Sequence, residues 1–112
     1  MDQRQALAAF GAISQETRLR ILRMLVRAGP AGVAAGAIGD AVEVSPSNVS
    51  FHLKELERAG LIVVRREARS MIYSAEYTAL RELIRFLMED CCAGLPEICE
   101  PAMAASGCGA AS

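Results

Sequence analysis

The segment from residue 45 to residue 60 constrains the fold most, because both ends of a helix are marked in it. Ser45 is a good N-cap, Pro46 suits the first helical position, and Gly60 is typical of a helix end. The sequence therefore predicts a helix over about 46–59. At about 100° per residue, this helix has an apolar stripe and an opposite, mainly polar face. The stripe is Val49, Leu53 and Leu56, and the opposite face carries Ser47, Phe51, Lys54 and Arg58.

Four further helices are predicted around this one. Residues 3–13 indicate a short helix, and Ser14 is a suitable N-cap for a second helix that Gly29-Pro30 ends. A weaker, Ala-rich helix covers about 33–42, and a strongly amphipathic last helix covers about 77–92. About five helices in a chain of 112 residues indicate one mainly α domain with a modest core.

A basic hairpin is predicted between the capped helix and the last helix. A β-branched run at 61–64 favours one strand, and 70–75, with Ile72 and Tyr73, favours a returning strand. Between them, 65–69 favours a charged turn without the Asn-Gly or Gly-Gly signal of a tight hairpin. Helix, the short linker 43–44, capped helix and hairpin follow each other in the order of a winged helix-turn-helix. The predicted class is therefore mainly α (α+β), with a β-hairpin wing.

Candidate DNA contacts lie on the capped helix and in the hairpin. They are Ser47, Asn48, Ser50, Phe51, His52, Lys54, Arg65, Arg66 and Arg69. The first turn of a recognition helix faces base edges, and Lys and Arg neutralise phosphates. Small polar residues are equally typical of any first helical turn, and the cations equally suit a solvated face. Phe51 favours an interface, because an aromatic ring opposite a core stripe needs a cover. His52 suits a structural hydrogen bond or a phosphate contact.

The net charge of −1 hides an uneven distribution. Residues 1–28 carry five arginines against two acidic residues, whereas 89–112 carry four acidic residues and no Lys or Arg. A basic half suits a polyanion, although scattered charges are as often solvated. The apolar run 6–13 is too short for a signal-peptide core or a membrane span. We expect a cytoplasmic protein without a membrane partner.

The capped helix resembles the recognition helix of the ArsR/SmtB family of metal-sensing repressors. The resemblance rests on SPSNVSFHLKEL from Ser45 to Leu56, followed by Ala59-Gly60-Leu61, and extends over roughly 5–90. It includes Thr17-Arg18-Leu19 in the second helix and Arg69 with Tyr73 in the hairpin. The resemblance implies a homodimer through the first and last helices. It also implies a repressor that binds double-stranded operator DNA when ion-free and releases it when an inducer binds.

Three departures from the family pattern narrow this expectation. The family's arsenic site uses two cysteines in the helix before the recognition helix, and 33–42 contains none. Its zinc site uses histidines on the last helix, and the only histidine here is His52. Ala68 stands in the wing turn where the family commonly has glycine. The remaining pattern is similar to members that carry their thiols at the end of the last helix.

All four cysteines fall within the last 22 residues, at and after the end of the last predicted helix. Thiols stay reduced in the cytosol, so the cluster favours a metal or redox site over disulfides. Cys91, Cys92 and Cys99 can converge, and three sulfurs suit As(III) or Sb(III), whereas zinc prefers four ligands. These three are the predicted ligands, with the ion as inducer and no catalytic cofactor. Cys108 lies in the tail 101–112, which we expect to be flexible, beyond a domain of residues 1–100.

Other functions for the thiols stay open to different degrees. Cd²⁺, Pb²⁺ or Zn²⁺ sensing and a redox-responsive repressor of the same fold are the alternatives. A thiol enzyme lacks support, because the chain has no Cys-x-x-Cys and no basic residue near the thiols to activate a nucleophile. A metal buffer would leave the basic wing and Phe51 unexplained. The sequence therefore predicts a regulator and not an enzyme.

Overall fold

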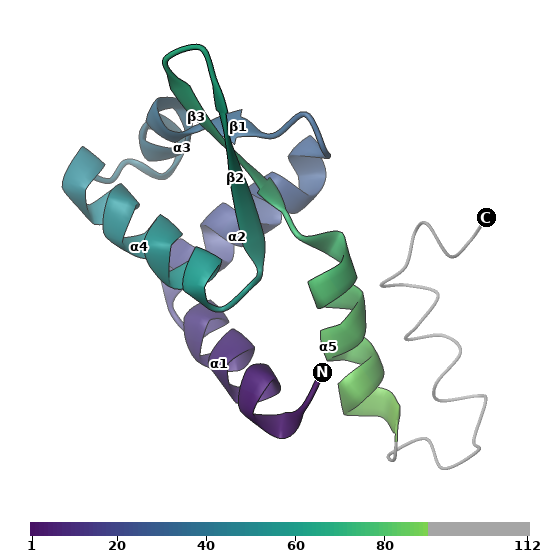
Figure 1. Cartoon of the computed structure of the whole chain (residues 1–112). Helices are drawn as coiled ribbons and strands as arrows, with labels where there is room; N and C mark the ends of the chain where they lie inside the picture. Colours follow the sequence, from purple (N-terminus) through teal and green to yellow (C-terminus); the bar gives the residue numbers. More distant parts are fainter. Residues whose placement is uncertain (90–112) are drawn as a thin grey trace.

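A computed structural model describes residues 1–89, shown in Figure 1. Within this range the elements are α1 (Gln3–Ile13), α2 (Glu16–Ala28), β1 (Val33–Ala34), α3 (Ala35–Val42), α4 (Pro46–Arg58), β2 (Ile62–Glu67), β3 (Ser70–Ala75) and α5 (Tyr77–Glu89). The predicted winged helix-turn-helix fold is confirmed. The predicted end of the last helix near 92 and the boundary at residue 100 lie outside the described residues.

The three strands form one antiparallel sheet in the order β1-β3-β2. β2 and β3 pair as far as Glu67 and Ser70, so only Ala68 and Arg69 form the tip. The prediction of a turn over 65–69 was wrong, because Arg65 and Arg66 continue the ladder of β2. We call β2, β3 and this tip the wing. Ala68 has a φ of 56°, in the left-handed region that favours the glycine common in the family.

The first strand was not predicted and depends on Gly32. β1 occupies the first two residues of the segment expected to be helical, and it pairs with Ile72 and Tyr73 of β3. Gly32 has a φ of 76°, and a Cβ there would lie 2.7 Å from both Ile72 Cγ2 and Tyr73 O. The chain can therefore approach β3 only because residue 32 has no side chain.

The helix caps agree with the sequence at α4 and differ at α2. Ser45 caps α4 through its side chain, and Pro46 takes the first helical position, as predicted. Ser14 was predicted to cap α2, but its backbone N–H donates to Phe10 O and so ends α1. Gln15 caps α2 instead, because its side-chain oxygen accepts from the backbone N–H of Arg18 at 2.8 Å.

The core lies where α2, α3 and α4 meet the wing strands. Its largest fully buried side chains are Ile21, Leu25, Ile38, Leu53, Leu56, Leu61 and Ile62. The predicted apolar stripe of α4 is confirmed, since Val49, Leu53 and Leu56 are all buried. Each such side chain contributes about 1.5–3 kcal/mol when fully buried. The stripe therefore fixes which face of α4 points outward.

α5 uses little of its apolar stripe within its own chain. It lies beside α1 in Figure 1, and Leu83 is buried there while Leu80 and Phe86 are half-buried. Leu87 of α5 is 46% exposed and Leu7 of α1 is 62% exposed. The two helices thus leave apolar side chains uncovered in the single chain. None of the helices within residues 1–89 is both long and apolar enough to cross a membrane.

Candidate nucleic-acid interface

The turn between α3 and α4 holds these two helices close together. Glu43 adopts a left-handed conformation with a φ of 56°, and Val44 N–H donates to Gly39 O. A Cβ at Gly39 would lie 3.2 Å from Val49 Cγ2, so a larger residue would push α4 outward. These local features set α3 and α4 as a helix-turn-helix.

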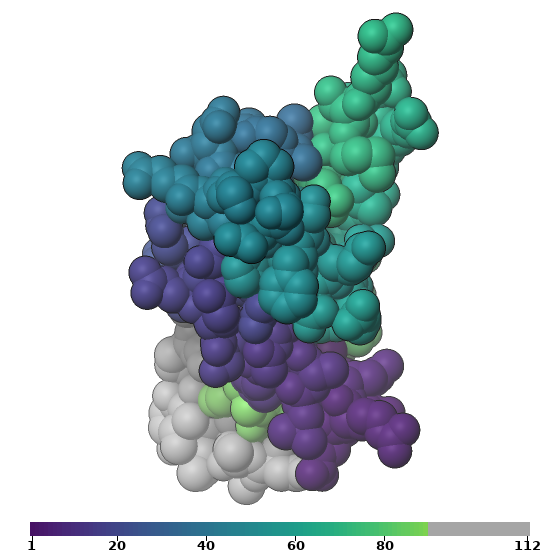
Figure 2. All heavy atoms as spheres, turned by 90° about the vertical axis from the view of Figure 1, so that its left-hand side faces the viewer, coloured from purple at the N-terminus to yellow at the C-terminus, as the bar shows by residue number. Residues whose placement is uncertain are grey.

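The outer face of α4 is polar and open to solvent. Figure 2 looks onto this side, with α4 near its centre and the wing at one edge. Its exposed residues include Ser47, Asn48, Ser50, Phe51 and Lys54. Hydroxyl and amide groups at the start of a helix can donate and accept hydrogen bonds at base edges. The structure therefore places these five predicted contacts on one accessible surface, and their DNA contacts stay a prediction.

Phe51 and His52 form a pair on this helix. The Phe51 side chain is 57% exposed, and its ring meets the His52 ring edge-on with centroids 5.5 Å apart. An exposed phenyl ring on a polar face can contact a thymine methyl group in the major groove. The two rings therefore place an apolar group at the centre of the outer face of α4, among its hydrogen-bond donors and acceptors.

His52 also reaches inward, to Arg18, which the sequence analysis named only as part of the family resemblance. Its Nδ1 lies 3.2 Å from Nη1 of Arg18 at the start of α2. Partial burial first, and then the Arg18 charge, lower the pKa of His52 from its usual value. His52 is therefore held in its neutral form near pH 7.

The three wing arginines have different surroundings. Arg65 donates to Glu67 at 2.6 Å, to Ala31 O at 2.7 Å and to Pro30 O at 3.2 Å. It fastens the wing to the loop before β1, a role that the sequence did not indicate. Arg66 and Arg69 are exposed, and within residues 1–89 neither forms an ion pair. Arg66 and Arg69 are therefore free of ion pairs in this range, whereas Arg65 is already engaged, and phosphate contacts by all three stay a prediction.

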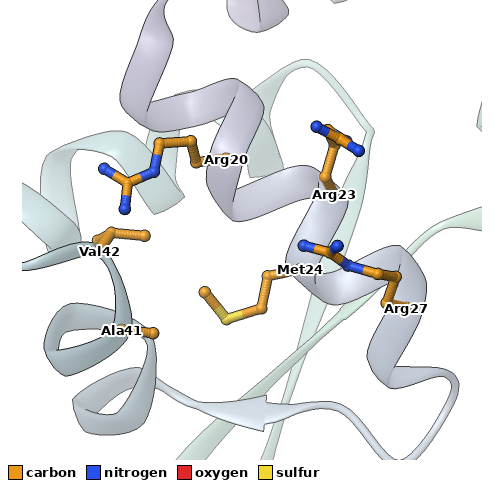
Figure 3. Close-up of a pocket in the computed structure, with 6 residues that line it drawn as sticks. All are labelled: Arg20, Arg23, Met24, Arg27, Ala41 and Val42. Carbon is orange, nitrogen blue, oxygen red and sulfur yellow. The ribbon is translucent and has the colours of Figure 1, made fainter.

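A further basic surface lies on α2. Arg20, Arg23, Met24 and Arg27 line a groove of about 410 Å³ together with Ala41 and Val42 at the end of α3. Figure 3 shows Arg20 and Met24 reaching toward this end of α3. The three arginines stand at i, i+3 and i+7, a helical spacing that marks one face in the sequence. Within the part of the chain that the structure describes they form no ion pair, so they add to the positive field of this half.

The predicted ion ligands cannot be placed. Cys91, Cys92 and Cys99 lie outside the described residues, as does Cys108. Among residues 1–89, no group of three His, Cys, Asp or Glu side chains is placed to hold a metal ion. The three-thiol site therefore stays a prediction, and the described portion offers no competing site.

Comparisons with known proteins agree with this geometry. Residues 13–65 match the family described as "Helix-turn-helix domain". The transcriptional activator HlyU of Vibrio cholerae is 32% identical over 83 residues, which cover 74% of each chain. The transcriptional repressor SdpR of Bacillus subtilis is 33% identical over 79 residues, which cover 70% of this chain and 84% of that one.

Solved structures show the same likeness. The structure described as reduced HlyU from Vibrio cholerae N16961 matches with a TM-score of 0.60 at 34% identity, covering 74% of this chain and 87% of that one. An ArsR-like transcriptional regulator from Rhodococcus sp. RHA1 matches with a TM-score of 0.65 at 25% identity, covering 84% and 92%. The chain therefore belongs to the ArsR/SmtB family of winged helix-turn-helix transcriptional regulators, which bind DNA and are not enzymes.

Proposed function

We propose that this protein is a cytoplasmic, homodimeric repressor that leaves its operator when As(III) or Sb(III) binds Cys91, Cys92 and Cys99. The observation that carries the DNA-binding part is the open face of α4 beside the wing arginines Arg66 and Arg69, which form no ion pair within residues 1–89. Base edges are read from α4 and phosphates are bound by the wing. The ion-sensing part rests on thiol chemistry and on the position of the cysteines in the sequence.

The proposed dimer is supported by the apolar side chains that α1 and α5 leave uncovered. Leu7 and Phe10 of α1 and Leu87 of α5 are exposed, and these two helices contact each other. Uncovered apolar groups on neighbouring elements favour association with a second apolar surface. A two-fold dimer would present two α4 helices to half-sites about 34 to 36 Å apart, one turn of DNA.

The proposed inducer site follows directly on the helix assigned to the interface. α5 is described as far as Glu89, and Cys91 and Cys92 are two and three residues further along. Glu89, Asp90 and two further glutamates disfavour thiolates nearby. Arsenous acid is neutral and exchanges hydroxyl groups for thiols without net proton release, so it tolerates protonated thiols better than a divalent cation does. Ion binding there would change the geometry of the proposed interface and the spacing of the two α4 helices.

Operator binding during ion titration tests this proposal. Fluorescence anisotropy of labelled upstream DNA should fall with arsenite and antimonite, and less or not at all with Cd²⁺, Pb²⁺ and Zn²⁺. Replacement of Cys91, Cys92 or Cys99 by Ser should abolish the arsenite response without changing ion-free binding. Cys108→Ser is the matched control and should respond like the wild type. Release of DNA by arsenite from Cys99→Ser would show that the three-thiol site is wrong.

A redox-responsive regulator is the second candidate, and one comparison favours it. A similar structure is described as reduced HlyU, which names an oxidation state of that protein. In this alternative, oxidation of the thiols replaces ion binding as the signal. Diamide would then release the operator and dithiothreitol would restore it, with no arsenite response. Since HlyU is described as an activator and SdpR as a repressor, a reporter gene must also establish the sign of regulation.

A further inference from the structure

Arg18 connects three helices at one point. Its Nε donates to Ala12 O at the end of α1 over 2.7 Å, and its Nη1 lies 3.2 Å from His52 Nδ1 on α4. Its backbone N–H is held by Gln15 Oε1 at 2.8 Å, which fixes the first turn of α2. Contacts of both the Arg18 backbone and the Arg18 side chain therefore fix its guanidinium group, which bridges α1 to α4.

This contact determines the tautomer of His52. A guanidinium group has donors and no acceptor, so Nδ1 must accept the hydrogen bond. A neutral imidazole that accepts at Nδ1 carries its proton at Nε2. Protonation of Nδ1 would set two N–H groups against each other and end the contact. The Arg18 geometry thus gives His52 one defined donor, Nε2–H.

The location of His52 on α4 allows that donor to reach DNA. The residue lies between the buried positions Val49 and Leu53 and the exposed Phe51, and its side chain is only partly buried. Residues at the edge of a recognition helix commonly contact the phosphate backbone beside the groove. A neutral N–H donor is one of the groups that can hold a phosphate oxygen there.

We propose that Arg18 is a positioning residue that holds His52 as a neutral Nε2–H donor to a DNA phosphate oxygen and ties this contact to the end of α1. The proposal rests on the DNA binding of the proposed function and is independent of its arsenic-sensing part. Through these contacts, a change at the proposed dimer interface can alter the DNA contact by way of residues that the structure describes. A shift of α1, whose Leu7 and Phe10 are exposed and belong to the proposed dimer interface, would move Ala12 O, then the guanidinium group, then the imidazole ring.

Nitrogen-15 NMR of the full-length protein tests the positioning without DNA. His52 is the only histidine, so its ring signals need no assignment. In the wild type, Nδ1 should give the shift of an unprotonated nitrogen and Nε2 that of a protonated one. Arg18→Met should produce a mixture of tautomers, whereas Arg20→Met, two residues along the same helix, should leave the pattern unchanged. A protonated Nδ1 in the wild type, or an unchanged pattern in Arg18→Met, overturns the proposal.

Two replacements of His52 test the DNA contact. Asn offers an amide oxygen near the Nδ1 position, so it can keep the Arg18 contact but loses the outer donor. Gln can place an amide N–H near Nε2. His52→Asn should bind operator about ten-fold more weakly, and His52→Gln should recover most of the loss. Equal binding by the wild type and His52→Asn contradicts the phosphate contact.

The salt dependence of operator binding separates a neutral donor from a cation. Because neutral His52 releases no counterion, His52→Asn should leave the salt slope unchanged, whereas loss of a cationic contact lowers it by about 0.9. The double variant Arg18→Met/His52→Asn should bind no more weakly than His52→Asn alone, since both changes remove one contact. Additive losses would assign Arg18 a merely structural role. Failure of the wild type to bind any upstream DNA would contradict the proposed function, and the tautomer measurement would still decide the positioning.

Discussion

α4 and α5 are both helices of 13 residues with an apolar stripe, but they use that stripe differently. α4 buries Val49, Leu53 and Leu56 within the chain, so its apolar side is fully covered. α5 buries only Leu83 and leaves Leu87 exposed. α4 therefore offers a partner a mainly polar face with the single exposed ring of Phe51, and α5 still has an apolar face. This difference agrees with the proposed roles, in which α4 contacts nucleic acid and α5 contacts a second copy of the chain.

The strongest test of this comparison removes one leucine from each helix. Leu53 is 1% exposed, so Leu53→Ala leaves a cavity and should lower the free energy of unfolding by about 2–5 kcal/mol. Leu87→Ala should cost much less in dilute protein, because its side chain is 46% exposed in the single chain. Urea denaturation at several protein concentrations measures both. A cost for Leu87→Ala that equals that of Leu53→Ala at every concentration would contradict the contrast.

The second test puts charge on the uncovered apolar surface. Leu7→Glu with Leu87→Glu should weaken the proposed dimer by about 2 kcal/mol or more, roughly 30-fold, because a carboxylate would have to be buried at the interface. Sedimentation velocity checks the association, and circular dichroism checks that the chain still folds. Glu82→Gln on the same helix is the control and should leave the dimer intact. A double variant that remains dimeric would place the interface elsewhere.

The third test compares cations on the outer faces of the two helices. Lys54→Gln on α4 should lower the salt slope of operator binding by about 0.9, because it removes one phosphate contact. Arg85→Gln on α5 removes the same charge from a helix that is not expected to touch DNA, so the slope should stay constant. Both side chains are exposed, which keeps effects on folding small. Equal slope changes would mean that DNA contacts extend over α5.

The smallest expected effect is a pH dependence of stability that belongs to α4. The pKa of His52 in the folded chain lies below its usual value of 6.5, because partial burial and then Arg18 disfavour the charged ring. The unfolded chain therefore binds the proton more readily as pH falls. The His52 contribution to stability is full above pH 6.5 and is lost as pH falls through the lower folded pKa. His52→Gln should flatten this part of the urea-denaturation profile, and an identical profile would contradict the shift.

The sequence predicted most accurately those elements that short-range signals determine. Ser45, Pro46 and Gly60 lie at the ends of α4, so its limits required no tertiary information. Ser14 was a wrong cap because its N–H stays within α1, and only the relative position of two helices decides that. β1 has two residues and owes its existence to pairing with β3, about 40 residues away. Such a short strand has no periodicity that a sequence could display.

The polar contacts of the interface were less predictable than its location. The outer residues of α4 follow from helical spacing, and the structure places them together as expected. Arg18 and His52 are 34 residues apart, and Arg65 meets carbonyl groups of Pro30 and Ala31 at a similar separation. Side-chain contacts over such distances depend on the packing of several elements. A sequence therefore shows that Arg65 is basic, but not that its side chain already forms hydrogen bonds within the protein.

The wing is held firmly at its base and has a strained backbone at its tip, and this difference affects how it can bend. Arg65 and Gly32 fasten the hairpin where it leaves the body of the protein, whereas Ala68 holds an unfavourable left-handed backbone at the far end. We therefore expect bending to be concentrated beyond Arg65, in the few residues that carry Arg66 and Arg69. In the proposed DNA complex, we expect the tip of the wing to follow variations in groove width while its base keeps a constant angle to α4.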